Sequence, residues 1–216
     1  MFIYFVHKKR MRLSPLVVIC CTTFLVCSCF ADGILKDQLP DWDRIRIAYD
    51  KYSAYPTSEN AKVVLDLFPL ESTNTEKGNR EHGLDHIFLS DNFMILENEI
   101  LAGERNSVEI AFRLLICSDA GYSERLYLTI GKLIRINPRL FIEVYSWYLN
   151  QSLYFKRAEQ PVYMVNEAYF QRISAHKYEL EMRIKALERV TDQIFLVTRE
   201  ACIKRLRKAI KELGAT

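Results

Sequence analysis

Apolar residues recur every three to four positions along most of the chain beyond residue 40, which is the spacing of amphipathic α-helices. Long alternations of polar and β-branched residues, the pattern typical of strands, are absent from the sequence. The pattern therefore predicts an all-α protein. The expected helices begin, in chain order, at or near Asp41, Thr57, Asp91, Asn106, Ser123 and Pro138.

Residues that cap or interrupt helices divide these segments. Thr57 or Ser58 can cap the second helix, because a side-chain oxygen accepts a hydrogen bond from a first-turn amide. Gly103 and Gly121 are predicted to end the helices that precede them. Residues 71–83 are almost wholly polar and are predicted to form a loop.

The C-terminal third predicts a helical hairpin. A helix over 161–172 leads into a segment whose apolar residues keep a 4-3-4-3 spacing as far as residue 213. Unbroken, this segment would be one helix of about 40 residues, roughly 60 Å long. Thr191 and Asp192 offer an N-cap in its middle, so the sequence favours two helices, and Gly214 marks the end of the second.

Short helices with tight breaks between residues 106 and 149 resemble the repeats of HEAT and armadillo proteins. The resemblance implies an α-solenoid-like stack with a concave binding face. The expected fold is therefore a single all-α domain over residues 32–216, built of stacked antiparallel helices with a C-terminal helical hairpin.

The first 31 residues have the composition of a secretory signal peptide. Four basic residues between Lys8 and Arg12 precede an uncharged and mostly apolar run over 13–30. Met11 is an alternative first residue, because a chain that starts there opens with a signal of ordinary shape. Either start predicts that the working part of the protein lies outside the cytosol.

Three fates of this export segment agree with the sequence. Residues 26–29 resemble a lipobox, in which the last cysteine takes lipid and becomes the new N-terminus, so Cys29 is the predicted lipidation site. Simple cleavage after Ala31 is the first alternative, since Cys29 and Ala31 are small residues at the positions that a signal peptidase reads. An uncleaved anchor is the second, because about 18 apolar residues are just long enough to cross a bilayer.

Charge and cysteine usage agree with export. The export segment contains four of the 30 basic residues and none of the 27 acidic ones, so the mature chain is close to neutral. Near neutrality argues against nucleic acid as a partner, because binding to phosphate backbones needs a net basic face. Four of the six cysteines also lie in this segment. The other two, Cys117 and Cys202, can either pair in an oxidising compartment or stay as buried thiols.

His82 and His86 are the candidate metal ligands. On a helix the two imidazoles would share one face, and with Asp85 they look like the HxxEH order of inverted zinc peptidases. Asp85 replaces the glutamate of that pattern, and Gly83 weakens the helix that the pattern needs. A third ligand would have to come from elsewhere, for example from Glu97 or Glu99. The other interpretation is two solvent-exposed histidines at the end of a loop.

Aromatic residues are concentrated between Phe141 and Phe170. Neighbouring rings on a helix point to different faces, so some of them must approach the surface, where tyrosine and tryptophan favour contact with a partner. The alternative is that all of them belong to the core. The predicted binding patch consists of Trp147, Tyr148, Tyr154, Phe155 and Tyr163.

The polar side of the last helix is basic. These residues form either a solvated face, well placed against the helix dipole, or a contact with anionic lipid head groups or an acidic partner. Both alternatives place the basic side chains outside the core. They are Lys204, Arg205, Arg207, Lys208 and Lys211.

The sequence contains no glycine-rich phosphate loop and no Ser/His/Asp nucleophile signature. It therefore predicts a non-enzymatic binding or scaffold protein of the bacterial cell envelope, without a cofactor. An envelope protein is the expected partner, and the lipid anchor or signal segment is the expected attachment to the membrane. The alternatives are a metal-dependent hydrolase built on His82, Asp85 and His86, and an exported inhibitor or immunity-type protein with one target.

Overall fold

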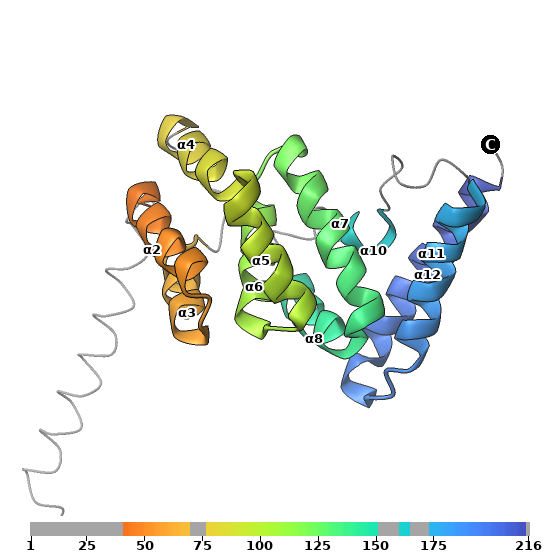
Figure 1. Ribbon diagram of the computed structural model, residues 1–216. Helices are drawn as coiled ribbons and strands as arrows, with labels where there is room; N and C mark the ends of the chain where they lie inside the picture. The colour runs from red at the N-terminus through yellow and green to blue at the C-terminus, as the bar shows by residue number, and fades with distance from the viewer. Residues whose placement is uncertain (1–40, 70–76, 151–159, 165–172, 215–216) are drawn as a thin grey trace, which may run out of the picture. The chain divides into compact units, whose positions relative to one another are not determined.

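The computed structural model describes residues 41–69, 77–150, 160–164 and 173–214, and all regular structure within these ranges is helical. The chain from Pro40 onward forms one compact unit. Its elements are α2 (Trp42–Ala54), α3 (Ser58–Leu67), α4 (Lys77–Phe88), α5 (Ser90–Ala102), α6 (Arg105–Cys117), α7 (Ala120–Ile136), α8 (Pro138–Asn150), α10 (Gln160–Tyr163), α11 (Ile173–Glu188), the 3-10 helix η1 (Gln193–Phe195) and α12 (Leu196–Leu213) (Figure 1).

Helices that follow one another in the chain pack together as a stack. α2 packs on α3 and α4, α3 packs on α6, and α5 and α6 both pack on α7. α11 and α12 form the predicted C-terminal hairpin, which packs against α7 and α8 (Figure 1). The all-α fold with stacked helices and a terminal hairpin is thus confirmed. No helix in the described ranges is long and apolar enough to span a bilayer.

Capping residues set most helix ends where the sequence predicts them. The Asp41 carboxylate accepts hydrogen bonds from the second and third amides after it, and the Thr57 hydroxyl accepts one from the third. Gly103 ends α5 in the left-handed conformation, with φ of 87°. The break predicted at Gly121 is wrong. Asp119 caps α7, so this glycine lies within the first turn of the helix.

The loop predicted over 71–83 is wrong from residue 77 onward, because that part belongs to α4. Residues 71–76 lie outside the described ranges. Gly83 lets α4 lie close to α2, since a Cβ there would lie 2.6 Å from Cε3 of the buried Trp42 ring. α4 therefore approaches α2 closely at Gly83, and its buried apolar side chains, Leu84, Ile87 and Phe88, all follow that glycine, so residues 77–83 contain none of the apolar positions that would indicate a helix.

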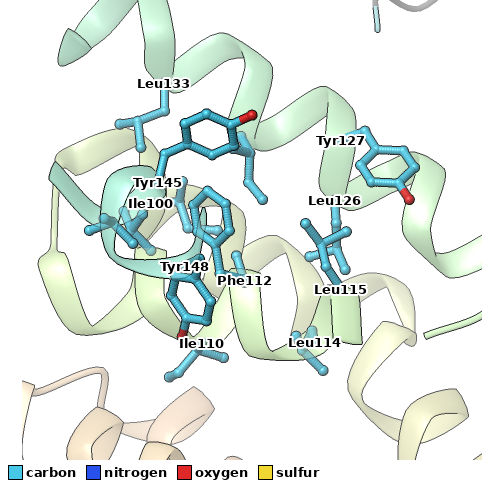
Figure 2. Packing of buried hydrophobic residues seen from close by; sticks show 14 of the residues in the cluster. Ile100, Ile110, Phe112, Leu114, Leu115, Leu126, Tyr127, Leu133, Tyr145 and Tyr148 are labelled. Carbon is cyan, nitrogen blue, oxygen red and sulfur yellow. The ribbon is translucent and has the colours of Figure 1, made fainter. Parts of the chain in front are cut away.

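The core between α6, α7 and α8 is built from stacked rings. Phe112 stacks on Tyr148 with ring centroids 5.0 Å apart, and Phe141 stacks on Tyr145 at 5.1 Å. Figure 2 shows Phe112 between the two tyrosines, with aliphatic side chains of α5, α6 and α7 around them. Offset aromatic pairs of this kind add about 0.5–1.5 kcal/mol beyond the burial of their area.

A buried hydrogen bond joins α2 to α6. The Tyr52 hydroxyl and the Ser107 Oγ lie 2.8 Å apart, and both side chains are almost fully buried. Burial raises the pKa of Tyr52 well above its usual value, and the hydrogen bond from Ser107 partly opposes that shift. The phenol therefore stays neutral in the folded chain and is available as a hydrogen-bond partner.

We expect Tyr52→Phe to lower the free energy of unfolding by about 1–3 kcal/mol, because Ser107 is left buried without this partner. Ser107→Ala should cost a similar amount. The double variant should lose clearly less than the two single losses combined, since no polar group is then stranded. Urea unfolding of the wild type and the three variants measures this, and strictly additive losses would contradict the proposed coupling.

Candidate functional site

Trp147 on α8 presents an exposed ring that other side chains hold in place. Its side chain is 44% exposed. The Arg113 guanidinium lies 6.0 Å from the ring centroid, and the Tyr148 ring meets the indole edge-on with centroids 4.6 Å apart. Both contacts are attractive, because a cation and a ring edge each favour the electron-rich face of an aromatic ring.

Arg113 is itself fixed by hydrogen bonds from two other helices. Its Nε donates to the Tyr148 hydroxyl at 3.0 Å, and its Nη1 donates at 3.1 Å to the carbonyl of Phe68 at the end of α3. The Tyr148 hydroxyl in turn donates to the carbonyl of Glu109 on α6 at 3.2 Å. The chain has therefore already ordered the surroundings of Trp147, which lowers the entropy cost of binding at this ring.

Only part of the predicted aromatic patch is a surface. Tyr148 is buried in the core, so its assignment to the binding patch is wrong. Tyr163 lies on α10 and is partly exposed, but α10 packs mainly against α7 and α12. Tyr154 and Phe155 lie outside the described residues. Trp147 is therefore the most exposed of the patch residues that the structure describes, and its ring is held by Arg113 and Tyr148.

Arg183 holds α10, and with it Tyr163, against the rest of the molecule. Its side chain is 2% exposed. One terminal nitrogen, Nη1, donates to three backbone carbonyls at the end of α10, and Nε donates to Glu179 at 3.3 Å. Burial lowers the pKa of Arg183, and the Glu179 carboxylate opposes this shift. The carbonyls bonded by Nη1 belong to Pro161, Val162 and Met164, at 3.0–3.2 Å.

A glycine on α7 makes room for this guanidinium. A Cβ at Gly131 would lie 2.7 Å from both terminal nitrogens of Arg183. On the other side, Arg135 donates to the second oxygen of Glu179 at 2.6 Å, so the carboxylate binds two arginines. α7, α10 and α11 thus meet at one buried ionic cluster.

The sequence carries a signal for this cluster in the spacing of α11. Position 183 lies on the same helix face as Leu180 and Leu187, so an arginine there interrupts an apolar stripe. A charge on a core-facing position needs a buried partner, since an isolated one costs many kcal/mol. The role of Gly131 had a weaker signal, because a glycine inside a helix often marks a close approach.

The two candidate metal ligands lie on α4, where His82 is exposed and His86 is partly buried. The His86 Nε2 forms a hydrogen bond with the Asp50 carboxylate on α2, and the Asn92 side chain donates to the His86 carbonyl at 2.9 Å. Asp85 accepts a hydrogen bond from the Tyr122 hydroxyl on α7. His86 and Asp85 therefore each tie α4 to a different helix.

No group of three or more His, Cys, Asp or Glu side chains that could hold a metal ion occurs among the described residues. Glu97, one of the two third ligands considered from the sequence, instead accepts hydrogen bonds from Lys132 at 2.9 Å and Thr129 at 3.2 Å. The geometry gives His86 a structural role between α4 and α2, whereas His82 lies exposed on α4.

The remaining predicted sites lie on α6, on α12 and in the export segment. No disulfide joins Cys117 to Cys202 in the structure, and both thiols are buried among apolar side chains, which is the second arrangement expected from the sequence. Lys204, Arg207, Lys208 and Lys211 are exposed on α12, and Arg205 is partly buried. Cys29 lies outside the described residues.

Comparison of this chain with models of protein families, with curated proteins and with solved structures finds no match. The argument for function therefore depends on the residues and geometry described above. Among them, the fixed and exposed ring of Trp147 is the feature with the chemistry of a binding site.

Proposed function

We propose that this chain is an exported, non-enzymatic binding or scaffold protein of the bacterial cell envelope, attached to the membrane through lipid on Cys29. The supporting observation is the exposed Trp147 ring, held by Arg113 and Tyr148. Tryptophan, tyrosine and arginine are the residues that most often dominate the energy of protein interfaces. An envelope protein that buries this ring is the proposed partner.

The charge of the chain supports the same proposal. Its mature part is close to neutral, so a sequence-independent attraction to nucleic acid is not expected. A neutral surface with one ordered aromatic anchor is suited to a specific partner, because aromatic anchors act through shape and desolvation rather than through long-range charge.

Site-specific cross-linking in intact cells tests the proposal. A photoreactive amino acid replaces Trp147 in one protein and Tyr55 in the control, where the side chain is 69% exposed at the end of α2. We expect a discrete protein adduct from position 147 that position 55 does not form. Equal, diffuse labelling from both positions would overturn the assignment of the binding surface.

We also expect Trp147→Ala to separate binding from stability. The variant should keep its free energy of unfolding within about 1 kcal/mol of wild type, because the ring is partly exposed. Its affinity for the partner identified by cross-linking should fall at least about tenfold, as for a central aromatic anchor. Tyr55→Ala should change neither quantity. A loss of about 3–5 kcal/mol in Trp147→Ala, typical of core rings, would make the ring structural.

A further inference from the structure

The outward face of α12 carries a row of lysines. Side chains spaced by four, three, four and three residues lie along one face of a helix. The opposite face contains Cys202 and Leu206, which are buried in the hairpin. The exposed residues at this spacing, called here the lysine face, are Val197, Ala201, Lys204, Lys208 and Lys211.

The arginines near this face are occupied within the protein. Arg199 donates to the carbonyl of Val190 at 2.7 Å and to the neighbouring Glu200 at 2.6 Å. Arg207 pairs with Glu188 of α11 at 3.4 Å. The Arg199 bond ties the start of α12 to the turn, and the Arg207 pair joins the two helices, although both of its side chains are mostly exposed.

The lysines instead point their charges at solvent. Within the part of the chain that the structure describes, Lys204 and Lys211 form no ion pair. Lys208 approaches Glu212 at 3.7 Å, but both side chains are mostly exposed, and a pair of that kind contributes little. The lysine face therefore keeps most of its positive charge available to a partner.

The turn of the hairpin adds exposed apolar side chains at one end of this face. Ile194 is 82% exposed and Val197 is 83% exposed, while Phe195 between them is buried and anchors the turn. Large aliphatic side chains exposed to this degree at the tip of a hairpin, next to a basic face, suit a contact with the interfacial layer of a membrane.

The distribution of charge orients the molecule in the same way. Residues 173–213 contain ten lysines and arginines against six acidic residues, whereas residues 41–150 contain 12 against 17. A near-neutral chain thus has a basic hairpin and an acidic remainder. An anionic surface would attract the basic hairpin and repel the acidic remainder of the chain. The hairpin is therefore the part of the molecule expected to contact such a surface.

We propose that the lysine face of α12 docks on an anionic membrane surface, with its three lysines beside the lipid phosphates and Ile194 and Val197 in the interfacial layer. The proposal rests on the proposed function, in which lipid on Cys29 holds the chain at a membrane. Lysine suits this contact because it is a compact charge on a long apolar stem. An acidic protein partner would favour bidentate arginine and aromatic anchors, and the five residues of this face include neither.

Photocross-linking of the full-length chain, export segment included, tests the docking. A photoreactive amino acid at Ala201 reports on the lysine face, and one at the exposed Val63 of α3 is the control. Each protein is reconstituted into vesicles of phosphatidylcholine alone or of phosphatidylcholine with phosphatidylglycerol. We expect lipid adducts from position 201 that increase at least about tenfold with the anionic lipid, since each lysine near such a surface contributes on the order of fivefold.

Two matched triple variants test the contribution of the lysines. Lys204→Glu, Lys208→Glu and Lys211→Glu together should abolish the increase at position 201. The control variant changes the net charge by the same amount at exposed positions of α2 and α3, through Arg44→Glu, Lys51→Glu and Lys62→Glu. In this control the increase in lipid adducts at position 201 should remain. Equal losses in both variants would show that only net charge matters and would overturn the docking surface.

The remaining outcomes separate this proposal from the proposed function. If the chain stays with the vesicles but position 201 gives no lipid adduct that depends on phosphatidylglycerol, the docking is overturned and the anchored binding protein stands. If position 201 instead forms an adduct with an acidic protein in intact cells, the membrane is the wrong occupant. If the chain does not stay with the vesicles at all, membrane attachment fails and the docking fails with it.

Discussion

Replacing Arg183 by methionine should lower the free energy of unfolding by about 3–5 kcal/mol, the usual cost of removing one member of a buried ion pair. The change leaves three carbonyls at the end of α10, those of Pro161, Val162 and Met164, without their donor and removes one of the two arginines that bind Glu179. Methionine keeps the length and much of the apolar volume of the side chain, so most of the loss would come from stranded polar groups.

Urea unfolding of Arg183→Met measures this loss, and Arg139→Met is the matched control. Arg139 is an exposed arginine that pairs with Asp192 at 3.3 Å, so its replacement should cost less than about 1 kcal/mol. Hydrogen exchange should also show that the amides near α10 lose protection first. Equal stability of the two variants would mean that the Arg183 cluster does not hold α10.

Gly131→Ala should lower the free energy of unfolding by about 1–3 kcal/mol, the usual cost of overpacking a filled interior. Alanine is the better helix former by about 1 kcal/mol, so an exposed site would respond in the opposite direction. Here the added methyl group would lie 2.7 Å from the buried guanidinium of Arg183, which is bonded on both sides and has little freedom to move.

A double-mutant cycle makes the Gly131→Ala prediction specific to the contact between Gly131 and the Arg183 guanidinium. In the Arg183→Met background the unbranched side chain can bend away, so Gly131→Ala should become neutral or stabilising. The sign of the alanine effect should therefore depend on residue 183. The same destabilisation in both backgrounds would contradict the close approach and would place the strain elsewhere on α7.

Local chemistry explains which parts of the fold the sequence predicted correctly. Asp41, Thr57 and Pro138 begin helices as expected because each acts on its own first turn, without help from distant residues. The terminal hairpin was predictable for a related reason. Its two helices repeat an apolar period on either side of a polar break at Thr191 and Asp192.

The parts that the sequence did not reveal depend on contacts between distant residues. The first half of α4 has the composition of a loop because its buried apolar residues, Leu84, Ile87 and Phe88, all lie after residue 83. Tyr148 was assigned to the surface because a ring at helical spacing does not reveal which face is covered. Arg113 was not considered at all, since its contacts with Phe68 and Tyr148 span 35 residues or more. Periodicity thus locates helices but does not determine which faces meet.

The sequence likewise predicts some residues of the candidate binding site but not how their side chains are held. Neighbouring rings predict that some of them reach the surface, and Trp147 is exposed while Tyr148 is buried, but the sequence places both in the patch and does not distinguish them. The rigidity of the ring was not foreseeable, since it depends on a guanidinium from α6. The basic face of α12 was visible in the sequence, but its separation into paired arginines and exposed lysines required the structure.

The central claim is that the chain works outside the cytosol as an attached binding protein. The most direct test is the intact mass and N-terminal residue of the protein recovered from separated membrane, periplasmic and cytosolic fractions. The account predicts a membrane-bound chain that begins at Cys29 and carries the mass of lipid, and Cys29→Ser should lose that mass. An unprocessed chain beginning at Met1 or Met11 and recovered from the cytosol would contradict it.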